Sequence, residues 1–342
     1  MKIKRGEKMK KFLSIFLAIL VAIGLTGCMK EDKKTILNKV YKKVNNVKGY
    51  MLEAEMELIN NEDSYNYDVT VSYKKEDNYR VSLRNKTNNH EQIILKNKDG
   101  VYVLNPNLNK SFKFQSKWPY NNSQSYLLQS VINDMKNDSS LSMKKTNKGY
   151  VFTSKVNYKN NAKLTHQEIL VDKNYNIKKV TVLDDDKNEM IIVQFKSIDM
   201  KAKFDDDYFE IDENMHTGFD NSEYQSQMNE LEEAIYPMYL PQGTYLETEK
   251  VVELDEGSRL ILTFAGENPF MLVEQTAAVE DEMLVIPTNG DLDIFMDTVA
   301  IVDDSSITWV SDGIEYYLVS SKLNSAELIE VAKSISNMPL TK

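Results

Sequence analysis

Leu52-Glu53-Ala54-Glu55-Met56-Glu57-Leu58 alternates apolar and acidic residues without interruption. Successive side chains of a β-strand point to opposite faces of its sheet, so this stretch predicts a strand with one buried and one solvated face. Strands of this kind belong to antiparallel sheets that are packed on one side only. The stretch therefore predicts a mainly β (α+β) fold whose apolar sheet face must be covered by another element.

The same period of two recurs along the chain on both sides of this stretch. Turn-forming residues separate the segments, for example Asn97-Lys98-Asp99-Gly100 and Asp184-Asp185-Asp186. We expect about ten antiparallel strands in a meander, curved around one or two helices. The further predicted strands are 65–73, 79–83, 101–104, 111–114, 141–145, 150–156, 164–171, 177–183 and 190–198.

Two segments with helical spacing are predicted to cover the sheet. Apolar residues from Ile36 to Val47 recur every three or four positions, with Thr35 as the predicted cap and Gly49 as the end. A second helix is predicted over 124–136, where Tyr126, Leu127, Val131 and Met135 share one side.

A second unit is predicted after this sheet. Residues 216–236 are expected to form a linker and a polar connecting helix, Glu223 to Ala234, and 237–342 a small acidic α+β domain. Its predicted strands are 245–254, 259–263, 270–275, 307–310 and 314–319, the last two joined by a tight turn at Asp312-Gly313. A closing helix after Asn324 has a capping box with Glu327.

Charge is distributed unevenly between the two units. Residues 216–342 carry 24 acidic and five basic residues, whereas 29–215 are close to neutral. Nucleic-acid binding is not expected, because it requires a clustered basic face. The acidity either keeps the second domain away from anionic lipid and wall polymers or simply keeps it soluble.

The N-terminus has the pattern of a secretory signal. Six basic residues between Lys2 and Lys11 precede fourteen uncharged residues, Phe12 to Leu25. At 1.5 Å per residue this run spans about 21 Å, which is short for a bilayer core of about 30 Å. A cleaved signal is therefore favoured over an uncleaved membrane helix, and Met9 offers a second start that leaves the signal intact.

Leu25-Thr26-Gly27-Cys28 matches the lipobox of bacterial lipoproteins, and Cys28 is the only cysteine. The match implies that residues 1–27 are a signal peptide that is cleaved off and that Cys28 is diacylated. Residues 28–34 would then form a tether between the lipid and the first domain. Two acyl chains give stable anchoring, whereas one chain is marginal. We therefore predict a lipid-anchored protein on the extracytoplasmic face of a membrane, with a forespore membrane as one candidate. A structural or redox thiol is the alternative for Cys28.

Residues that could carry chemistry are few. His90, His166 and His216 lack metal-ligand spacing, and we expect surface or structural roles for them. Glu53, Glu55 and Glu57 share one face of a strand, and two of them could approach the separation of the carboxylate pair in a glycosidase. Because the alternation makes this face the solvated one, we interpret them as solvent-exposed charges. Asp184–Asp186 and Asp205–Asp207 lack the glycine and distal glutamate of a calcium loop. We expect no metal, no cofactor and no catalysis.

A family resemblance rests on the N-terminal helix, the meander and three segments: Val101-Tyr102-Val103-Leu104-Asn105-Pro106, Trp118-Pro119 and Tyr126-Leu127-Leu128-Gln129-Ser130. In these features the first unit resembles the LolA-like lipoprotein-carrier superfamily. Within it, residues 35–215 are most similar to the sporulation and germination lipoproteins of the GerS and YdcC type. The resemblance implies a curved antiparallel half-barrel covered by helices. The Trp309…Gly313…Tyr316…Leu328 series resembles the uncharacterised, DUF4367-like domain that follows LolA-like domains in Firmicute lipoproteins.

Two functions follow as hypotheses from this resemblance. The first is a non-catalytic protein that acts in sporulation and germination by binding and licensing a cell-wall (cortex) amidase. The second is binding or presentation of a lipid in a LolA-like cavity. Because an anchor at Cys28 prevents shuttling between membranes, the first hypothesis is favoured.

Overall fold

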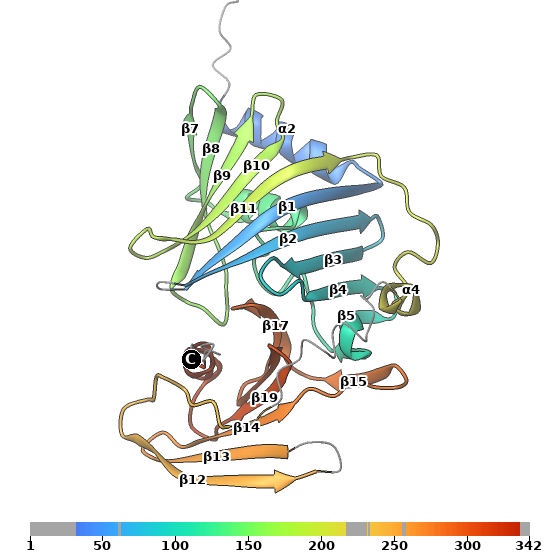
Figure 1. Ribbon diagram of the computed structural model, residues 1–342. Coiled ribbons are helices and arrows are strands. Elements are labelled where there is room, and N and C mark those ends of the chain that lie inside the picture. The colour runs from blue at the N-terminus through green and yellow to red at the C-terminus, as the bar shows by residue number, and fades with distance from the viewer. Residues whose placement is uncertain (1–31, 61–62, 217–230, 232, 255–257, 336–342) are drawn as a thin grey trace, which may run out of the picture.

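The protein consists of two sheets, one above the other in the view of Figure 1, and all their strand pairs except β15–β6 are antiparallel. The computed structural model describes residues 32–60, 63–216, 231, 233–254 and 258–335. Strands dominate and helices are few, so the prediction of a mainly β fold is confirmed.

The first sheet has twelve strands in the order β15-β6-β5-β4-β3-β2-β1-β11-β10-β9-β8-β7. It is not the single meander that the sequence predicts, because β1 pairs with both β2 and β11 and so joins two meanders at the centre. The bounds are β1 Gly49–Asn60, β2 Asp63–Lys74, β3 Asn78–Asn85, β4 Glu91–Asn97, β5 Gly100–Asn105, β6 Lys110–Phe114, β7 Ser142–Lys145, β8 Gly149–Lys155, β9 Leu164–Asp172, β10 Ile177–Asp184, β11 Glu189–Asp199 and β15 Leu284–Thr288.

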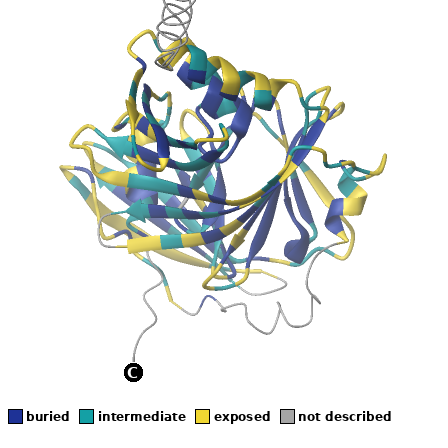
Figure 2. Ribbon diagram, turned by 90° about the horizontal axis from the view of Figure 1, so that it is seen from above, coloured by how far each residue is buried: buried dark blue, intermediate teal, exposed yellow. Residues whose placement is uncertain are grey.

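Two helices cover the apolar face of this sheet, as predicted. Leu52, Ala54 and Met56 of β1 are buried on the side where α2 (Lys33–Asn45) and α3 (Leu128–Asn137) pack. Figure 2 shows the buried residues gathered between the curved sheet and the helix that crosses it. The predicted cap is wrong: the side chain of Asp32 accepts a hydrogen bond from the backbone N–H of Thr35, so Asp32 is the cap and Thr35 lies inside the helix.

Strands β4 and β5 are buried on both faces. Ile94, Val101 and Val103 belong to the main core, whereas Ile93, Leu95, Tyr102 and Leu104 pack on the other side against Phe209 and Met215. The short helix α4 (Ile211–Met215) belongs to this covering segment. A strand covered on both sides has no polar alternation, which is why the sequence analysis did not predict β4.

The second sheet has the order β12-β13-β14-β19-β18-β17-β16. The turn Asp312-Gly313 has positive φ at both residues, 48° and 80°, as the predicted tight hairpin requires. The capping box between Asn324 and Glu327 is present at the start of α6 (Ser325–Lys333). The strand bounds are β12 Thr244–Glu253, β13 Ser258–Gly266, β14 Phe270–Thr276, β16 Asp291–Phe295, β17 Thr298–Val302, β18 Ser306–Ser311 and β19 Ile314–Val319.

The predicted connecting helix, Glu223 to Ala234, lies mostly outside the described residues. Its last described positions, Glu233 and Ala234, are not helical. Here the backbone is held by the second sheet instead, since the N–H of Ile235 donates to the carboxylate of Glu274 at 2.9 Å.

The two sheets are joined by a strand and by buried polar contacts. β15 runs parallel to β6 and so extends the first sheet from a segment of the second unit. Oε1 of Gln92 accepts hydrogen bonds from the Val299 N–H at 2.6 Å and the Thr298 hydroxyl at 3.1 Å. The Tyr67 hydroxyl donates to the carbonyl of Met296 at 2.7 Å. These contacts place the second sheet in a defined position against the first.

We expect Gln92→Ala to lower the free energy of unfolding by about 1–3 kcal/mol, because it leaves the buried N–H of Val299 without an acceptor. Urea denaturation measures the change. Gln194→Ala, on the exposed side of β11, is the matched control and should stay within about 0.5 kcal/mol of the parent. Equal losses in both variants would contradict the proposed joint.

Candidate functional site

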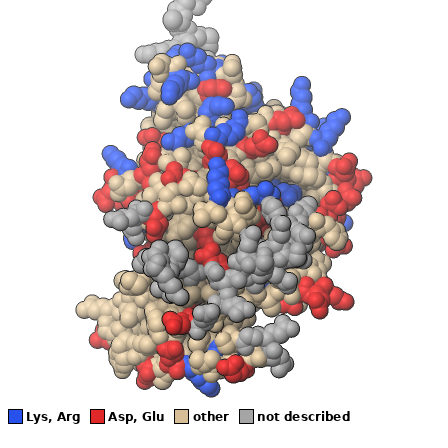
Figure 3. Space-filling model, in the orientation of Figure 1, with Lys and Arg blue, Asp and Glu red and all other residues tan. Residues whose placement is uncertain are grey.

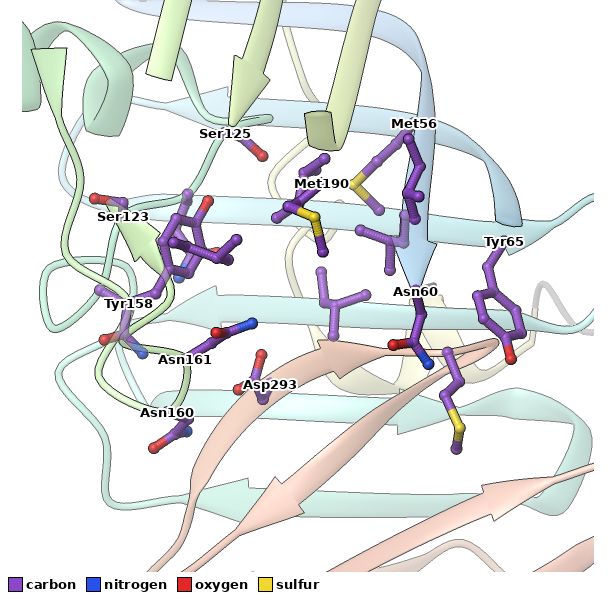
Figure 4. A pocket seen from close by; sticks show the side chains of 18 of the residues that line it. Met56, Asn60, Tyr65, Ser123, Ser125, Tyr158, Asn160, Asn161, Met190 and Asp293 are labelled. Atoms are coloured by element: carbon purple, nitrogen blue, oxygen red, sulfur yellow. The ribbon is translucent and has the colours of Figure 1, made fainter. Parts of the chain in front are cut away.

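A cavity of about 110 Å³ lies between the first sheet and β16. Met56 and Leu58 of β1, Met190 at the start of β11 and Leu292 of β16 form its apolar wall. The polar side carries Asp293, Asn160 and Asn161, and Figure 4 shows these side chains close to one another. The cavity thus combines a flexible methionine-rich wall with a single carboxylate.

The volume of this cavity limits what it can hold. An apolar cavity of about 150 Å³ accommodates benzene, so 110 Å³ suits a group of a few heavy atoms or several waters. A complete acyl chain requires movement of the surrounding side chains. The cavity as it stands therefore does not favour lipid binding.

Asp293 supplies the carboxyl group among the residues that line the cavity. Burial raises the pKa of its carboxyl to about 6, against the opposing effects of the Lys333 ammonium and the Asn160 side chain. Tyr158 lies nearby, and burial likewise raises the pKa of its hydroxyl. A carboxyl group and a protonated phenol can hold a polar ligand group, but they do not form a nucleophile with an adjacent base.

A second candidate surface lies at the far edge of the second sheet. Large apolar side chains that are 36% to 77% exposed gather on β12 and on the segment before it; we call them the β12 edge patch. Its members are Tyr236, Met238, Tyr239, Leu240, Tyr245, Leu246 and Val251. Exposed apolar groups concentrated in this way are typical of protein–protein interaction sites.

The position of β12 adds to this interpretation. β12 is the end strand of its sheet, and nearly all of its residues are exposed. Among the described residues no strand pairs with its outer edge, so backbone donors and acceptors are available to a partner. The Tyr236 hydroxyl donates to Glu249 of β12 at 2.5 Å, which holds the preceding segment against the strand.

The structure places the three histidines apart. His90 lies in the loop before β4 and is buried, its Nε2 lies 3.3 Å from Oδ1 of Asn105, and burial lowers its pKa. His166 on β9 and His216 after α4 are exposed. Within the described ranges, no group of three or more His, Cys, Asp or Glu side chains could hold a metal ion.

The acidic residues singled out in the sequence are structural or solvated. Glu53, Glu55 and Glu57 lie on the outer face of β1, as predicted. Glu55 pairs with Lys196 at 2.5 Å and Lys86 at 2.9 Å, and these hydrogen bonds lower its pKa to about 2. Asp184 accepts hydrogen bonds from Asn188 in its turn.

Asp205–Asp207 lies in a segment of turns after β11. Cys28 lies outside the described residues. Of the described helices, none is long and apolar enough to cross a membrane.

Two features of these sites escaped the sequence analysis. The alternation Asp291-Leu292-Asp293-Ile294 could have predicted β16, but nothing local indicates that Asp293 faces a cavity in the other unit. The run Tyr236-Pro237-Met238-Tyr239-Leu240 is visibly apolar and could have been recognised as an exposed segment once the linker ended there.

The fold and these surfaces define a mainly β protein with a curved, helix-covered antiparallel sheet, to which a second sheet is fixed. The chain belongs to the Sporulation protein YdcC-like family, whose model matches residues 8–209. It is 33% identical over 327 residues to Sporulation protein YdcC of Bacillus subtilis (strain 168), covering 95% of this chain and 97% of the relative.

Comparison with solved structures finds more distant similarities. A LolA superfamily protein from Nitrosomonas europaea matches at 10% identity and a TM-score of 0.32, covering 53% of this chain and 98% of that one. A chain of the CwlD amidase–GerS lipoprotein complex from Clostridioides difficile matches at 17% identity and a TM-score of 0.23, covering 52% and 99%. TM-scores of this size carry no argument about function.

We expect Asp293→Asn to make stability less dependent on pH. The carboxyl binds its proton more tightly in the folded state than in the unfolded chain, so its ionisation lowers stability as pH rises from about 4 to 6. At pH 7.5 the variant should be more stable than the parent by about 1–2 kcal/mol, with no difference at pH 3.5. Urea denaturation at both pH values measures this. An equal difference at both values would contradict the assignment to ionisation.

Proposed function

We propose that this chain is a lipid-anchored, non-catalytic protein that acts in sporulation by binding a cell-wall amidase on the extracytoplasmic face of the membrane. The observation that carries the proposal is the family relationship, which extends over nearly the whole chain. Among the residues that the structure describes, no group of three or more His, Cys, Asp or Glu side chains could hold a metal ion.

The anchor in this proposal is Cys28. The residues matched by the family model include the last three basic residues before the apolar run, the run itself and Leu25-Thr26-Gly27-Cys28. Cys28 precedes Asp32, the cap of α2, by only four residues, so a lipidated Cys28 would hold the start of α2 within about 14 Å of the membrane.

Charge supports the same orientation. Exposed Lys33, Lys34, Lys39 and Lys42 lie on α2, and Figure 3 shows basic side chains gathered on the part of the molecule that carries this helix. Lysines close to an anionic membrane surface are each worth about 1 kcal/mol of attraction. The acidic second unit is repelled by the same surface.

The β12 edge patch is the surface that we propose for the amidase. It combines exposed aromatic side chains with an open strand edge, which together allow backbone hydrogen bonds and apolar burial. The resemblance to the GerS type implies an amidase partner, and in Clostridioides difficile a CwlD amidase forms a complex with the GerS lipoprotein.

Lipid binding is the second hypothesis from the sequence. The cavity between the sheets does not favour it, because its volume of about 110 Å³ is too small for an acyl chain. We therefore do not adopt it as the proposed function.

We expect Cys28→Ala to abolish incorporation of labelled fatty acid into the protein, because the thioether acceptor is lost. Metabolic labelling followed by immunoprecipitation measures the incorporation. Ser14→Ala, within the apolar run, is the control and should keep the label. Label that persists in Cys28→Ala would contradict the proposed anchor.

We expect the double variant Leu246→Glu/Val251→Glu to reduce crosslinking to the amidase in sporulating cells at least tenfold, since two charges replace apolar groups of the patch. Met51→Glu, an exposed apolar residue on β1, is the matched control. The readout is amidase recovered after crosslinking and pull-down. Amidase absent from the parent pull-down would contradict the partner, and equal recovery from the double variant would contradict the surface.

A further inference from the structure

A polar cleft beside α3 is not used by the proposed function. Its volume is about 270 Å³, close to the lower end of small-molecule pockets at about 300 Å³. Eight of its ten lining residues are polar and none is a cation. It shares only Asn122 and Ser123 with the cavity between the sheets.

One side of α3 supplies most of this lining. At about 100° per residue, Gln129, Ser130, Asn133, Asp134 and Asn137 fall within an arc of about 140° on the helix. The core residues of α3 occupy the remaining side. The helix therefore presents a continuous row of amide, hydroxyl and carboxylate groups to the cleft.

Gln129 brings a buried, unsatisfied donor to the cleft. Its side chain is only 9% exposed, and its Oε1 accepts a hydrogen bond from the Tyr50 hydroxyl at 2.6 Å. This bond leaves Nε2 as a donor, and Nε2 has no hydrogen-bond partner among the residues that the structure describes. A buried donor without an acceptor costs about 1–3 kcal/mol, so a ligand carbonyl or hydroxyl at this place would restore a lost interaction.

Asp134 supplies the acceptor. Its Oδ2 accepts from Nε2 of Gln167 at 3.0 Å, and its two oxygens offer about four acceptor positions, more than the bonds from Gln167 and Ser123 use. Burial raises the pKa of Asp134 to about 6, against hydrogen bonds from Ser123 and Gln167, so the carboxylate is partly desolvated.

Tyr120 adds an aromatic surface at the margin of the cleft. It is 60% exposed, yet its hydroxyl donates to Asp77 and the Lys96 ammonium lies 4.6 Å from its ring centroid. These two contacts hold the ring in place while leaving much of it open to a ligand. The negative face of such a ring attracts weakly positive C–H groups.

From this arrangement we infer that the cleft binds an N-acetylated amino sugar of a glycan chain. An acetamido group carries one carbonyl and one N–H, which match the unsatisfied donor of Gln129 and the acceptor of Asp134. Sugar hydroxyls both donate and accept, as the side chains of Asn133, Asn137 and Ser130 do, and the C–H face of a sugar ring packs on Tyr120. The carboxylate of Asp134 in the lining disfavours phosphate and carboxylate ligands, because like charges repel.

The inference can be tested with the full chain in detergent and the β-1,4-linked tetramer of N-acetylglucosamine as probe, by isothermal titration calorimetry. We expect binding that Asn133→Ala/Asn137→Ala weakens at least tenfold and Asp134→Asn weakens as well. Asn45→Ala, on the neighbouring helix α2, is the matched control and should bind as the parent does. Circular dichroism verifies that each variant is folded.

Cellotetraose, which has hydroxyls in place of acetamido groups, should bind at least tenfold more weakly than the tetramer. The inference would be overturned if the parent did not bind the tetramer, or if the double variant bound the tetramer as tightly as the parent does. Equal binding of cellotetraose would overturn the acetamido specificity, and binding of tetraglycine without the sugar would assign the cleft to peptides. None of these outcomes depends on Cys28 or on an amidase.

Discussion

The pairing of β1 with β11 is the contact on which the rest of the structure depends. β1 pairs with β2, which begins three positions after β1 ends, but with β11 only after more than one hundred intervening residues. A shift of one residue in either register would turn the acidic side chains of β1 into the core and its apolar side chains into water. The strict alternation from Leu52 to Leu58 therefore determines the register of both halves of the sheet and the face on which α2 and α3 pack.

This constraint explains which elements the sequence could predict. β1, the β18–β19 hairpin and the capping box of α6 depend on local residues, and all three were predicted. β4 has no alternation because both of its faces are buried, and β15 is defined by its partner β6 in the other unit rather than by its own pattern. The cap of α2 was misplaced because Asp32 and Thr35 both have suitable side chains, and only the backbone conformation selects between them.

The candidate sites were less predictable than the fold, for a physical reason. The carboxylate of Asp293 faces residues that lie more than one hundred positions away in the chain, and its neighbourhood exists only after the two sheets meet. Nothing in the sequence around Gln129 indicates a binding role either. Its amide Nε2 is left unsatisfied because Oε1 accepts a hydrogen bond from Tyr50, which lies on another element. By contrast, the solvated role of Glu53, Glu55 and Glu57 follows from alternation alone.

The joint between the sheets bears on how an anchored protein could present a partner. β15 adds to the first sheet, Gln92 and Tyr67 bond to the backbone of the second unit, and Lys110 pairs with Glu315 at 3.3 Å, although its side chain is almost fully buried. The Lys110 ammonium also lies 3.8 Å from the carboxylate of Glu280, so two carboxylates of the second unit pair with it. The second sheet is thus fixed to the first by several independent contacts rather than by its connecting chain alone.

Figure 1 shows α2 and β12 at opposite ends of the molecule. With the proposed anchor four residues before α2, the β12 edge patch would point away from the membrane, and the rigid body rather than a flexible tether would set its distance from the lipid surface.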